Sequence, residues 1–520
     1  MATATETNTP PDLANGLISG DRLLSREALE VDVARAAAGF AASGLGQGDC
    51  VAILMRNDIA YLVASLAAIR LGAYAVPLNW HFKADEIAFI LADCGAKLLV
   101  AHADLVAGLD DAIAAGLMRL IVRTPPELVD AFAIPTAHTS PAPHEDWDAW
   151  LARQSPYTGP AVPPTQSMIY TSGTTGRPKG VRRNPATAEQ EKAIATNRRE
   201  LYGFGPGART LMPGPLYHSA PNGFALRAVS QTDVLVLMPK FEPEAFLALV
   251  EKHRITALFM VPTMFVRLLK LPTAVRQRYD ISSLKFVMHA AAPCPPDVKR
   301  QMIEWWGLIV QEFYGATELG AATVIRAEEW LRKPGSVGRA APGATLRILD
   351  DNGREVPQGS IGEVFARLDY YPDFDYHNSP DARAEIERDG LITCGDMGYI
   401  DTEGYLFLCD RKRDMVISGG VNIYPAEIEA AAIGMPGVKD CAVFGIPDAE
   451  FGEALMAIVE PMPGVTLVPD AVRAFLSQAI AGYKVPRRIE IQNGLPREDS
   501  GKIFKRRLRE PYWQDAGRKI

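Results

Sequence analysis

The sequence predicts an α/β protein built on parallel sheets, followed by a smaller antiparallel β unit and a C-terminal region of mixed α and β structure. Two patterns and the length indicate this fold class. Short apolar runs alternate with helical patterns over most of the first 400 residues, which is typical of parallel sheets with helices on both faces. Turn signals and short strands dominate after about residue 335. The 520 residues exceed one core and suggest roughly two to four folding units.

The alternation begins with "CVAILM" (50–55), a predicted strand, and a helical pattern over 59–73. These apolar runs are short and bounded by turn residues, which favours strands, whereas the helical segments repeat their apolar positions about every 3.6 residues. The predicted strands and helices that continue the series are 74–80, 84–95, 97–103, 117–123, 233–240, 242–254, 255–262, 284–293, 296–307 and 308–315.

The second half of the chain has a different texture. Within 344–368, "DNG" and "PQGS" indicate hairpins or turns of a small antiparallel β unit. From "DRKRD" (410–414) onward the chain returns to mixed structure, with a helix predicted at 425–433 and strands near 438–446 and 454–461. Because "DRKRD" is charged and poor in apolar residues, it is a plausible linker or hinge.

Composition excludes several classes of protein. The 48% hydrophobic and 22% charged residues are typical of an ordinary globular protein, and a net charge of -8 argues against a nucleic-acid partner. No uninterrupted apolar stretch approaches the roughly 18 residues of a membrane span, and the N-terminus lacks signal-peptide features. The six cysteines are scattered, as expected in a reducing compartment without structural zinc. We therefore expect a cytoplasmic protein.

The stretch "YTSGTTGRPKG" (170–180) is rich in groups that bind phosphate. Hydroxyls and glycine N–H groups can donate to phosphate oxygens, and a lysine adds a cation. Its spacing differs from the G-x-x-x-x-G-K-[ST] loop, and a flexible surface loop explains the composition equally well. The candidate phosphate contacts are Thr171, Ser172, Gly173, Thr174, Thr175, Gly176 and Lys179.

Two further stretches carry suitable chemistry. In "FYGATELG" (313–320), Tyr314 can cover a base, Thr317 can reach a phosphate and Glu318 can hold Mg²⁺, at a strand end where open α/β sheets bind ligands. The alternative is a strand end with an unrelated acid. In "TCGDMGY" (393–399), Asp396 is predicted in a turn between glycines, where it can accept both hydroxyls of a ribose. Taken alone, an ordinary turn aspartate is the simpler interpretation.

Seven motifs in this order give the chain a specific resemblance. From about residue 20 to 510 it resembles the adenylate-forming superfamily of acyl-CoA synthetases, luciferases and peptide-synthetase adenylation domains, and most closely bacterial fatty-acyl or related hydrophobic acyl-CoA synthetases. The motifs are "YTSGTTGRPKG", "PLYH" (215–218), "FYGATELG", "GSVGRA" (335–340), "CGDMGY" (394–399), "DRKRDMVISGGVNIYPAEIE" (410–429) and "LPREDSGKIFKR" (495–506).

The resemblance implies a large N-terminal domain over residues 1–412, with two stacked parallel-rich α/β subdomains and a β subdomain at about 335–409. A small mobile α+β domain then follows over residues 413–520. The hinge position falls on Arg413, where the family more often has Asp or Lys. Cys394 and the segment "AAAPC" also depart from the family, which usually has a small polar residue and more glycine at these places.

The resemblance also implies a two-step reaction. A carboxylate attacks the α-phosphate of Mg·ATP to give an acyl-adenylate and pyrophosphate, and the thiol of CoA then displaces AMP. The loop 171–179 would hold the leaving phosphates, Thr317 and Glu318 the α-phosphate and Mg²⁺, and Asp396 with Arg411 the ribose. Tyr314 would stack on adenine, with Ala291, Ala292 and Pro293 on its other side.

The C-terminal residues take their roles from the resemblance as well. Lys502 would reach the α-phosphate and the carboxylate oxygen in the first step, although without the motif it is one more lysine in a basic tail. Gly419 and Gly420 would line the channel for the pantetheine arm of CoA, where a side chain would block it.

The predicted acid pocket favours an uncharged, hydrophobic carboxylic acid. By the resemblance, Gly315 stands where the family's acetate-specific members carry a bulky Trp, so it leaves depth. "YHSAPNG" lacks the Asp with which relatives that activate amino acids hold an ammonium group. A medium- or long-chain fatty acid, a steroid-like acid and an aryl acid of the benzoate or cinnamate type remain open. A stand-alone adenylation enzyme that loads a carrier protein, a light-emitting oxidase and a homodimer also remain open. The candidate lining is Tyr217, His218 (a gate or a packed imidazole), Phe259, Met260, Met288, His289 and Gly315.

Overall fold

The computed structural model forms two compact units, each described here by itself. Unit 1 comprises Met1–His289, Met302–Gln311 and Tyr370–Glu385, and unit 2 comprises Ala290–Gln301, Glu312–Asp369 and Ile386–Ile520. The structure describes residues 15–109, 113–114, 116–171, 178–412, 414–418, 421–448, 451–497 and 503–514. Among the predicted site residues, those outside the described ranges are Ser172, Gly173, Thr174, Thr175, Gly176, Arg413, Gly419, Gly420 and Lys502.

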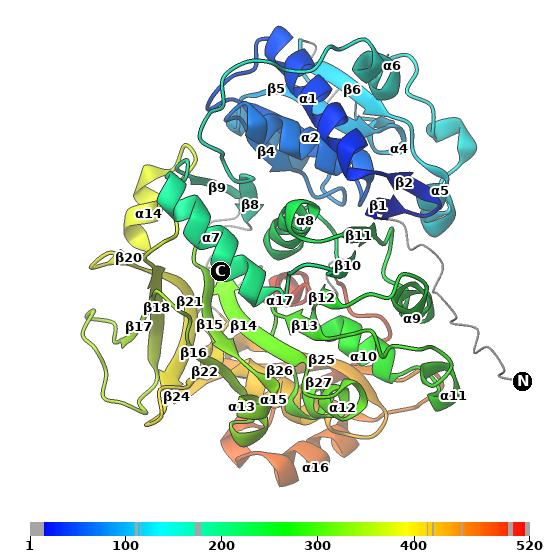
Figure 1. Ribbon diagram of the computed structural model, residues 1–520. Coiled ribbons are helices and arrows are strands. Elements are labelled where there is room, and N and C mark those ends of the chain that lie inside the picture. The colour runs from blue at the N-terminus through cyan, green and yellow to red at the C-terminus, as the bar shows by residue number, and fades with distance from the viewer. Residues whose placement is uncertain are drawn as a thin grey trace, which may run out of the picture. The chain divides into compact units, whose positions relative to one another are not determined.

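A five-stranded parallel sheet of unit 1 confirms the first part of the predicted alternation. Its order is β4-β3-β5-β6-β7, and all five residues of β3 are buried, because helices cover both faces. Figure 1 shows α1 and α2 packed side by side against this sheet. The strands are β3 (Cys50–Leu54), β4 (Tyr74–Pro77), β5 (Ala96–His102), β6 (Met118–Val122) and β7 (Glu145–Asp146). The helices are α1 (Arg26–Ala42), α2 (Ile59–Arg70), α3 (Ala84–Asp93), α4 (Ala103–Val106), α5 (Pro126–Phe132), α6 (Trp147–Ala152) and the 3₁₀ turn Thr136–His138.

A second set of strands in unit 1 runs in the order β13-β12-β10-β11-β1-β2, parallel except at β2. These strands are β1 (Gly16–Ser19), β2 (Arg22–Leu24), β10 (Arg209–Met212), β11 (Val234–Leu237), β12 (Ala257–Met260) and β13 (Phe286–His289). The helices are α7 (Ala188–Leu201), α8 (Ser219–Gln231), α9 (Pro243–Lys252), α10 (Pro262–Leu269) and α11 (Thr273–Arg276). A small antiparallel sheet joins β8 (Ile169–Thr171), β9 (Lys179–Arg183) and β19 (Phe374–Tyr376), next to α14 (Pro380–Glu385).

Unit 2 contains the predicted antiparallel β region, in the order β17-β18-β21-β22-β16-β15-β14. The sequence reading missed β15, which folds back on β14 as a hairpin. Asp396 was predicted in a turn, and this is wrong: it lies inside β21, paired with Arg411 of β22. Two elements belong to unit 2 only in part, because residues 302–311 are in unit 1: α12 (Pro296–Trp306) and β14 (Val310–Ala316). The others are β15 (Gly320–Ile325), α13 (Ala327–Arg332), β16 (Ser336–Ala340), β17 (Ala344–Leu349), β18 (Gly362–Leu368), β20 (Glu387–Arg388), β21 (Leu391–Ile400) and β22 (Leu406–Arg411).

The C-terminal part of unit 2 has its own sheet, in the order β24-β23-β26-β25 with β27 parallel to β26. The helix predicted at 425–433 is confirmed as α15. The core of this C-terminal part contains Ile428 of α15, Val443 of β25 and Leu476 of α16. The elements are β23 (Val416–Ser418), β24 (Val421–Ile423), α15 (Pro425–Ile433), β25 (Val438–Asp448), β26 (Gly452–Pro461), α16 (Pro469–Ala479), the 3₁₀ turn Gly482–Lys484, β27 (Arg488–Ile491) and α17 (Lys505–Trp513).

Local chemistry sets the helix ends. The Ser25 side chain accepts from the N–H of Ala28 and so caps α1, and Thr187 with Gln190 forms a capping box at α7. The helix predicted over 59–73 stops at Arg70 because Gly72 adopts a positive φ of 68°, which glycine tolerates best.

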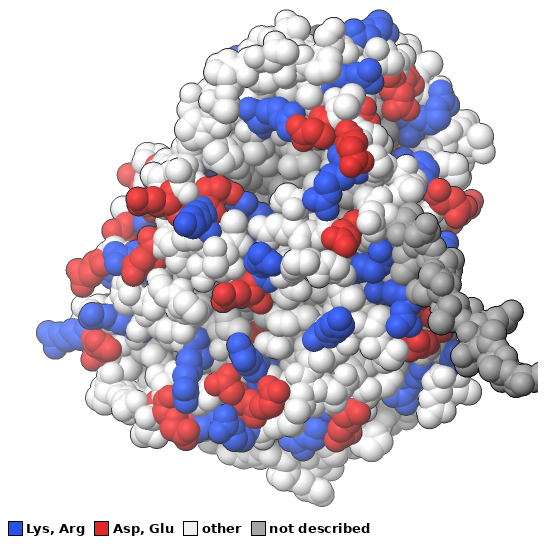
Figure 2. Space-filling view, in the orientation of Figure 1, with Lys and Arg blue, Asp and Glu red and all other residues white. Residues whose placement is uncertain are grey.

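The charge distribution on the surface and the length of the helices can be compared with those of nucleic-acid-binding and membrane proteins. On the face shown in Figure 2, basic and acidic side chains are interspersed, whereas a nucleic-acid surface gathers Lys and Arg in one patch. Of the helices in the described ranges, none is both long enough and apolar enough to cross a membrane.

Candidate functional site

Three predicted nucleotide residues meet in unit 2. Tyr314 near the end of β14 donates its hydroxyl to Asp396 Oδ2 at 2.8 Å, and Arg411 Nε lies 3.3 Å from Asp396 Oδ1. Burial and then the Asp396 carboxylate raise the pKa of Tyr314 well above its ordinary value, so the phenol stays a donor. Each carboxylate oxygen has a second lone pair, and Asp396 can therefore still accept from a ribose hydroxyl.

Thr317 and Glu318 lie in the tight turn of the β14–β15 hairpin, where Ala316 pairs with Gly320. Both side chains keep exposed surface, and Glu318 Oε2 lies 4.0 Å from the Cys394 sulfur of β21. The turn therefore presents a carboxylate and a hydroxyl near the Tyr314–Asp396 pair. A magnesium ion that arrives with nucleotide phosphates needs only one or two such carboxylates, and Glu318 fits that requirement. No cluster of three metal-binding side chains occurs within the described part of the chain.

The predicted adenine segment, Ala291–Pro293, follows β13 in the sequence. Ala291 has a φ of 77°, a left-handed conformation that favours glycine, and Ala291 and Pro293 are exposed. This gives a physical reason why relatives carry more glycine in the segment. A strained, exposed backbone of this kind is often found where a ligand is held.

Asp396→Ala is expected to raise the KM for ATP by about 10- to 100-fold, because hydrogen bonds to a charged group contribute roughly 1.5–3 kcal/mol each. The KM for the acid should change little. Steady-state kinetics with each substrate varied in turn measures both effects. Asp369→Ala is the matched control, since Asp369 is an exposed carboxylate that also pairs with an arginine, the exposed Arg367. A rise of equal size in both KM values would contradict a ribose contact.

The flanks of the predicted phosphate loop lie in unit 1. Thr171 and Lys179 are opposite each other in the antiparallel β8–β9 ladder. The Lys179 ammonium lies 5.5 Å from the centre of the Tyr376 ring. The preceding residue, Tyr170, donates to Asp93 Oδ2 at 2.6 Å, which ties the entry strand to the end of α3. Both ends of the loop are therefore fixed to the sheet.

The predicted acid-pocket residues of unit 1 fall into two groups. Phe259 and Met260 pair in register with Met288 and His289 on the neighbouring strands β12 and β13, and all four are at most 1% exposed. His218 keeps exposed surface at the N-terminus of α8, and Tyr217 is buried beside it with ring centres 4.4 Å apart. Only His218 of this set is open enough to act as a gate.

The structure explains the glycine at position 315 without reference to the depth of the acid pocket. A Cβ at this position would collide with the backbone carbonyl of Gly320 across the β14–β15 hairpin, where the register shifts. The hairpin therefore requires glycine here. The size of the acid has to be argued from other residues.

The sequence reading missed a buried ion pair in unit 2. Lys299 Nζ on α12 lies 2.5 Å from Glu312 Oε2, and the two side chains are 0% and 7% exposed. The ammonium also lies 4.9 Å from the Trp330 ring centre. Burial lowers the pKa of Lys299 and raises that of Glu312, although each partner opposes the shift. The sequence does contain a sign that Lys299 is buried, because it lies on the same helical face as Met302, Ile303 and Trp306.

The chain is anchored on both sides of Lys502. Arg497 pairs with Asp440 at 2.7 Å and with Glu460 at 2.8 Å, and it forms an antiparallel bridge with Ile503. Lys505 lies 2.7 Å from Glu429 of α15. These contacts, which sequence reasoning did not predict, connect the residues around Lys502 to the sheet and helix of the C-terminal region.

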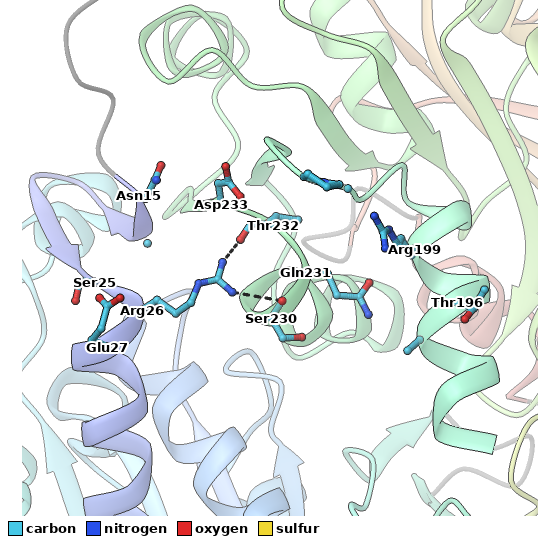
Figure 3. Close-up of a pocket in the computed structure, with 14 residues that line it drawn as sticks. Asn15, Ser25, Arg26, Glu27, Thr196, Arg199, Ser230, Gln231, Thr232 and Asp233 are labelled. Carbon is cyan, nitrogen blue, oxygen red and sulfur yellow. Dashed lines mark hydrogen bonds between the residues drawn. The ribbon is translucent and has the colours of Figure 1, made fainter. Parts of the chain in front are cut away.

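A separate pocket of about 640 Å³ lies in unit 1 (Figure 3). Residues from the start of α1, from α7 and from the end of α8 line it, among them Thr196, Arg199 and Gln231. Arg26 crosses one side and donates to the backbone carbonyls of Ser230 and Thr232. None of its lining residues belongs to the predicted ATP or acid sites.

Comparisons with known proteins agree with this geometry. The model of the AMP-binding enzyme family matches residues 6–369, and that of the AMP-binding enzyme C-terminal domain matches residues 427–502. An indoleacetate–CoA ligase of Aromatoleum aromaticum is 34% identical over 94% of this chain and 93% of its own length. A long-chain-fatty-acid–CoA ligase of Mycobacterium tuberculosis is 31% identical over 91% of this chain and 90% of its own. The ATP-bound structure of MatB from Rhodopseudomonas palustris is similar with a TM-score of 0.82, at 28% identity over 98% of both chains.

Proposed function

Because this chain belongs to the family of AMP-binding enzymes and is an AMP-forming acid–thiol ligase, we propose that it converts a hydrophobic carboxylic acid into its CoA thioester through an acyl-adenylate. The observation that carries the proposal is the meeting of Tyr314, Asp396 and Arg411 beside the Thr317–Glu318 turn. Tyr314 and Asp396 are 82 residues apart in the sequence, and Arg411 comes from a third motif.

In the first half-reaction the acid's carboxylate attacks the α-phosphate of ATP and pyrophosphate leaves. Tyr314 would cover the adenine opposite Ala291–Pro293, Asp396 and Arg411 would hold the ribose, and Thr317 the α-phosphate. Mg²⁺, held by Glu318, would neutralise phosphate charge. The loop 171–179 would hold the leaving phosphates. Lys502 would neutralise the charge that develops between the carboxylate and the α-phosphate. Such positioned charges supply most of the catalysis of phosphate chemistry.

In the second half-reaction the CoA thiol attacks the acyl carbon, the C–O bond to phosphate breaks and AMP leaves. For this step we propose that residues 413–520 rotate about Arg413, which removes Lys502 and brings Gly419 and Gly420 beside the acyl-adenylate. The strands β23 and β24, which precede and follow residues 419–420 in the sequence, pair with each other and carry the exposed Ile417 and Val421. The family's two-step reaction uses one site for two different attacks, which such a rotation allows.

The acid is proposed to be a medium- or long-chain fatty acid or a bulkier acyl group. Four of the seven candidate lining residues are at most 1% exposed in unit 1: Phe259, Met260, Met288 and His289. Three of them are apolar, which suits an apolar substrate. An aryl acid is the second candidate, favoured by the relative that acts on indoleacetate. A carrier protein in place of CoA is the third.

A panel of carboxylic acids, assayed for pyrophosphate release with and without CoA, tests the proposal. We expect release with fatty or aryl acids, and turnover should rise when CoA is present because the thiol removes the adenylate. Release that no acid stimulates would overturn the proposed function. Formation of an acyl-adenylate that CoA does not discharge would instead support the carrier-protein alternative.

Gly420→Leu is expected to spare acid-dependent pyrophosphate release within about twofold and to lower thioester formation at least about 100-fold, because a side chain would block the thiol channel. Val421→Leu is the matched control, since Val421 is already an exposed apolar residue. Single-turnover measurement of each half-reaction separates the effects. Equal survival of both steps in Gly420→Leu would remove the glycine from the channel.

A further inference from the structure

Arg198, in the last turn of α7, is a half-buried cation without a carboxylate partner. Its Nη2 donates to the Tyr371 hydroxyl, and the structure records no ion pair for it within the described ranges. Comparable arginines of unit 1 are paired: Arg227 with Glu191, and Arg56 with Asp104 at 2.6 Å. Because a charge removed from water needs a compensating partner, the unused donors of Arg198 are suited to an oxygen that the protein itself does not supply.

The surroundings of Arg198 are electropositive. The Arg183 guanidinium lies 4.2 Å from the centre of the Tyr371 ring. Burial alone would raise the pKa of Tyr371, but Arg198 and Arg183 outweigh it and hold the pKa below its ordinary value. The Tyr371 hydroxyl also donates to Gln166 Oε1 at 3.0 Å, and Gln166 Nε2 is buried with no hydrogen-bond partner in the described part of the chain. Two cations and one unsatisfied amide donor therefore converge on this phenol.

This cluster lies against the helix that begins at His218. Gly223 sits in the interior of α8, where glycine costs about 1 kcal/mol relative to alanine. A Cβ there would meet Arg198 Nη1, so any side chain at this position would displace the guanidinium. Both Arg198 and Gly223 keep accessible surface. Five residues of helix separate Gly223 from His218, about 7.5 Å along the axis.

The apolar side of the same region connects to the predicted acid pocket. Tyr202, which follows α7, has its ring centre 6.2 Å from that of Phe259 and 5.0 Å from that of Phe224 on α8. These three rings are at most 3% exposed, so they form a packed aromatic wall beside the predicted acid pocket. Gly223 of α8 keeps accessible surface, and an acid whose carboxylate reacts near His218 would approach Arg198 there.

We propose that Arg198, supported by Tyr371, recognises a hydrogen-bond acceptor at the end of the acid remote from the reacting carboxylate. The inference rests on the proposed function and narrows it. The preferred substrates are then ring-bearing or medium-length acids with a distal hydroxyl, carbonyl or second carboxylate, and unmodified alkyl chains are poorer. Arg198 is a specificity residue, whereas Tyr371 and Gly223 position its guanidinium.

The test compares kcat/KM within matched acid pairs, measured by pyrophosphate release with CoA present. The probes are phenylpropanoic acid against its para-hydroxy derivative, and octanoic against octanedioic acid. The wild-type protein should prefer at least one oxygenated member by about 10- to 100-fold, as expected for a hydrogen bond to a charged group. A preference for octanedioic acid alone would identify the acceptor as a carboxylate. A preference for the para-hydroxy acid alone would identify it as a neutral oxygen.

Three variants decide whether Arg198 is responsible. Arg198→Met should bring the ratio of kcat/KM values within each acid pair close to one, while kcat/KM for the plain acids stays within a few-fold of wild type. Arg198→Lys should restore part of the wild-type preference. Gly223→Ala keeps the charge but displaces the guanidinium, and it should lower the preference in the same direction. Arg199→Met, in the separate pocket, should leave the preference unchanged. Melting curves confirm that each variant is folded.

The outcomes separate this inference from the function on which it rests. A wild-type preference near one, or a preference that survives both Arg198→Met and Gly223→Ala, overturns the role of Arg198 while the ligase activity stands. The absence of pyrophosphate release with every acid overturns both.

Discussion

Lys502→Ala is expected to lower the rate of acyl-adenylate formation by at least about 10²–10³-fold, the range found when one group that stabilises developing charge is removed. Thioester formation from acyl-adenylate supplied from outside should remain within a few-fold of wild type. The reason is that the lysine's charge is needed only while negative charge develops between the carboxylate and the α-phosphate. Acid-dependent pyrophosphate release and discharge of synthetic acyl-adenylate by CoA measure the two steps separately.

Arg506→Ala is the control for this variant, because Arg506 is 61% exposed on α17 and lies near Glu510 of the same helix. It should leave both half-reactions unchanged. If Lys502→Ala slowed both half-reactions equally, the proposal that this lysine serves one step and then leaves would be wrong for this protein.

Lys299→Met is expected to lower the free energy of unfolding by about 3–5 kcal/mol, because it leaves the Glu312 carboxylate buried without its partner. The effect is on stability first, although Glu312 lies two residues before Tyr314 on β14. Urea denaturation followed by tryptophan fluorescence measures it, since the Lys299 ammonium lies 4.9 Å from the Trp330 ring centre.

The double variant Lys299→Met/Glu312→Leu should recover most of the lost stability, since two apolar groups of similar volume no longer leave a charge buried. A single variant as stable as wild type would show that water or another group satisfies Glu312. A double variant no better than the single one would assign the loss to packing around Trp330 rather than to the unpaired charge.

The elements of the fold that could be predicted are those defined by local patterns. The strand 50–55, the helix 425–433 and the antiparallel strands after about residue 335 were found because apolar period and turn residues are properties of neighbouring positions. Asp396 was misplaced for the same reason: the glycines on either side, Gly395 and Gly398, indicate a turn locally. The strand β21 nevertheless continues through them, because β22 supplies the ladder partner of Asp396, Arg411.

The residues of the candidate site could also be predicted only where a local pattern marks them. The residues of the ATP motifs are recognisable because each motif is contiguous and the order is specific. That Tyr314 donates to Asp396, and that Gly315 is required by the backbone of Gly320, depends on strand register. Register is decided by packing over the whole sheet.

The sequence by itself determined the class of chemistry: its motifs identified an AMP-binding enzyme with an α/β fold and a C-terminal region of its own. The roles of the nucleotide residues and of Lys502 stay predictions. The tertiary structure alone decided which charges are buried and which are paired. Lys299 and Glu312 are 13 residues apart and Arg198 and Tyr371 are 173 apart. The energy of such groups depends on the low-dielectric surroundings and the partner that folding brings, and neither is visible in a one-dimensional pattern.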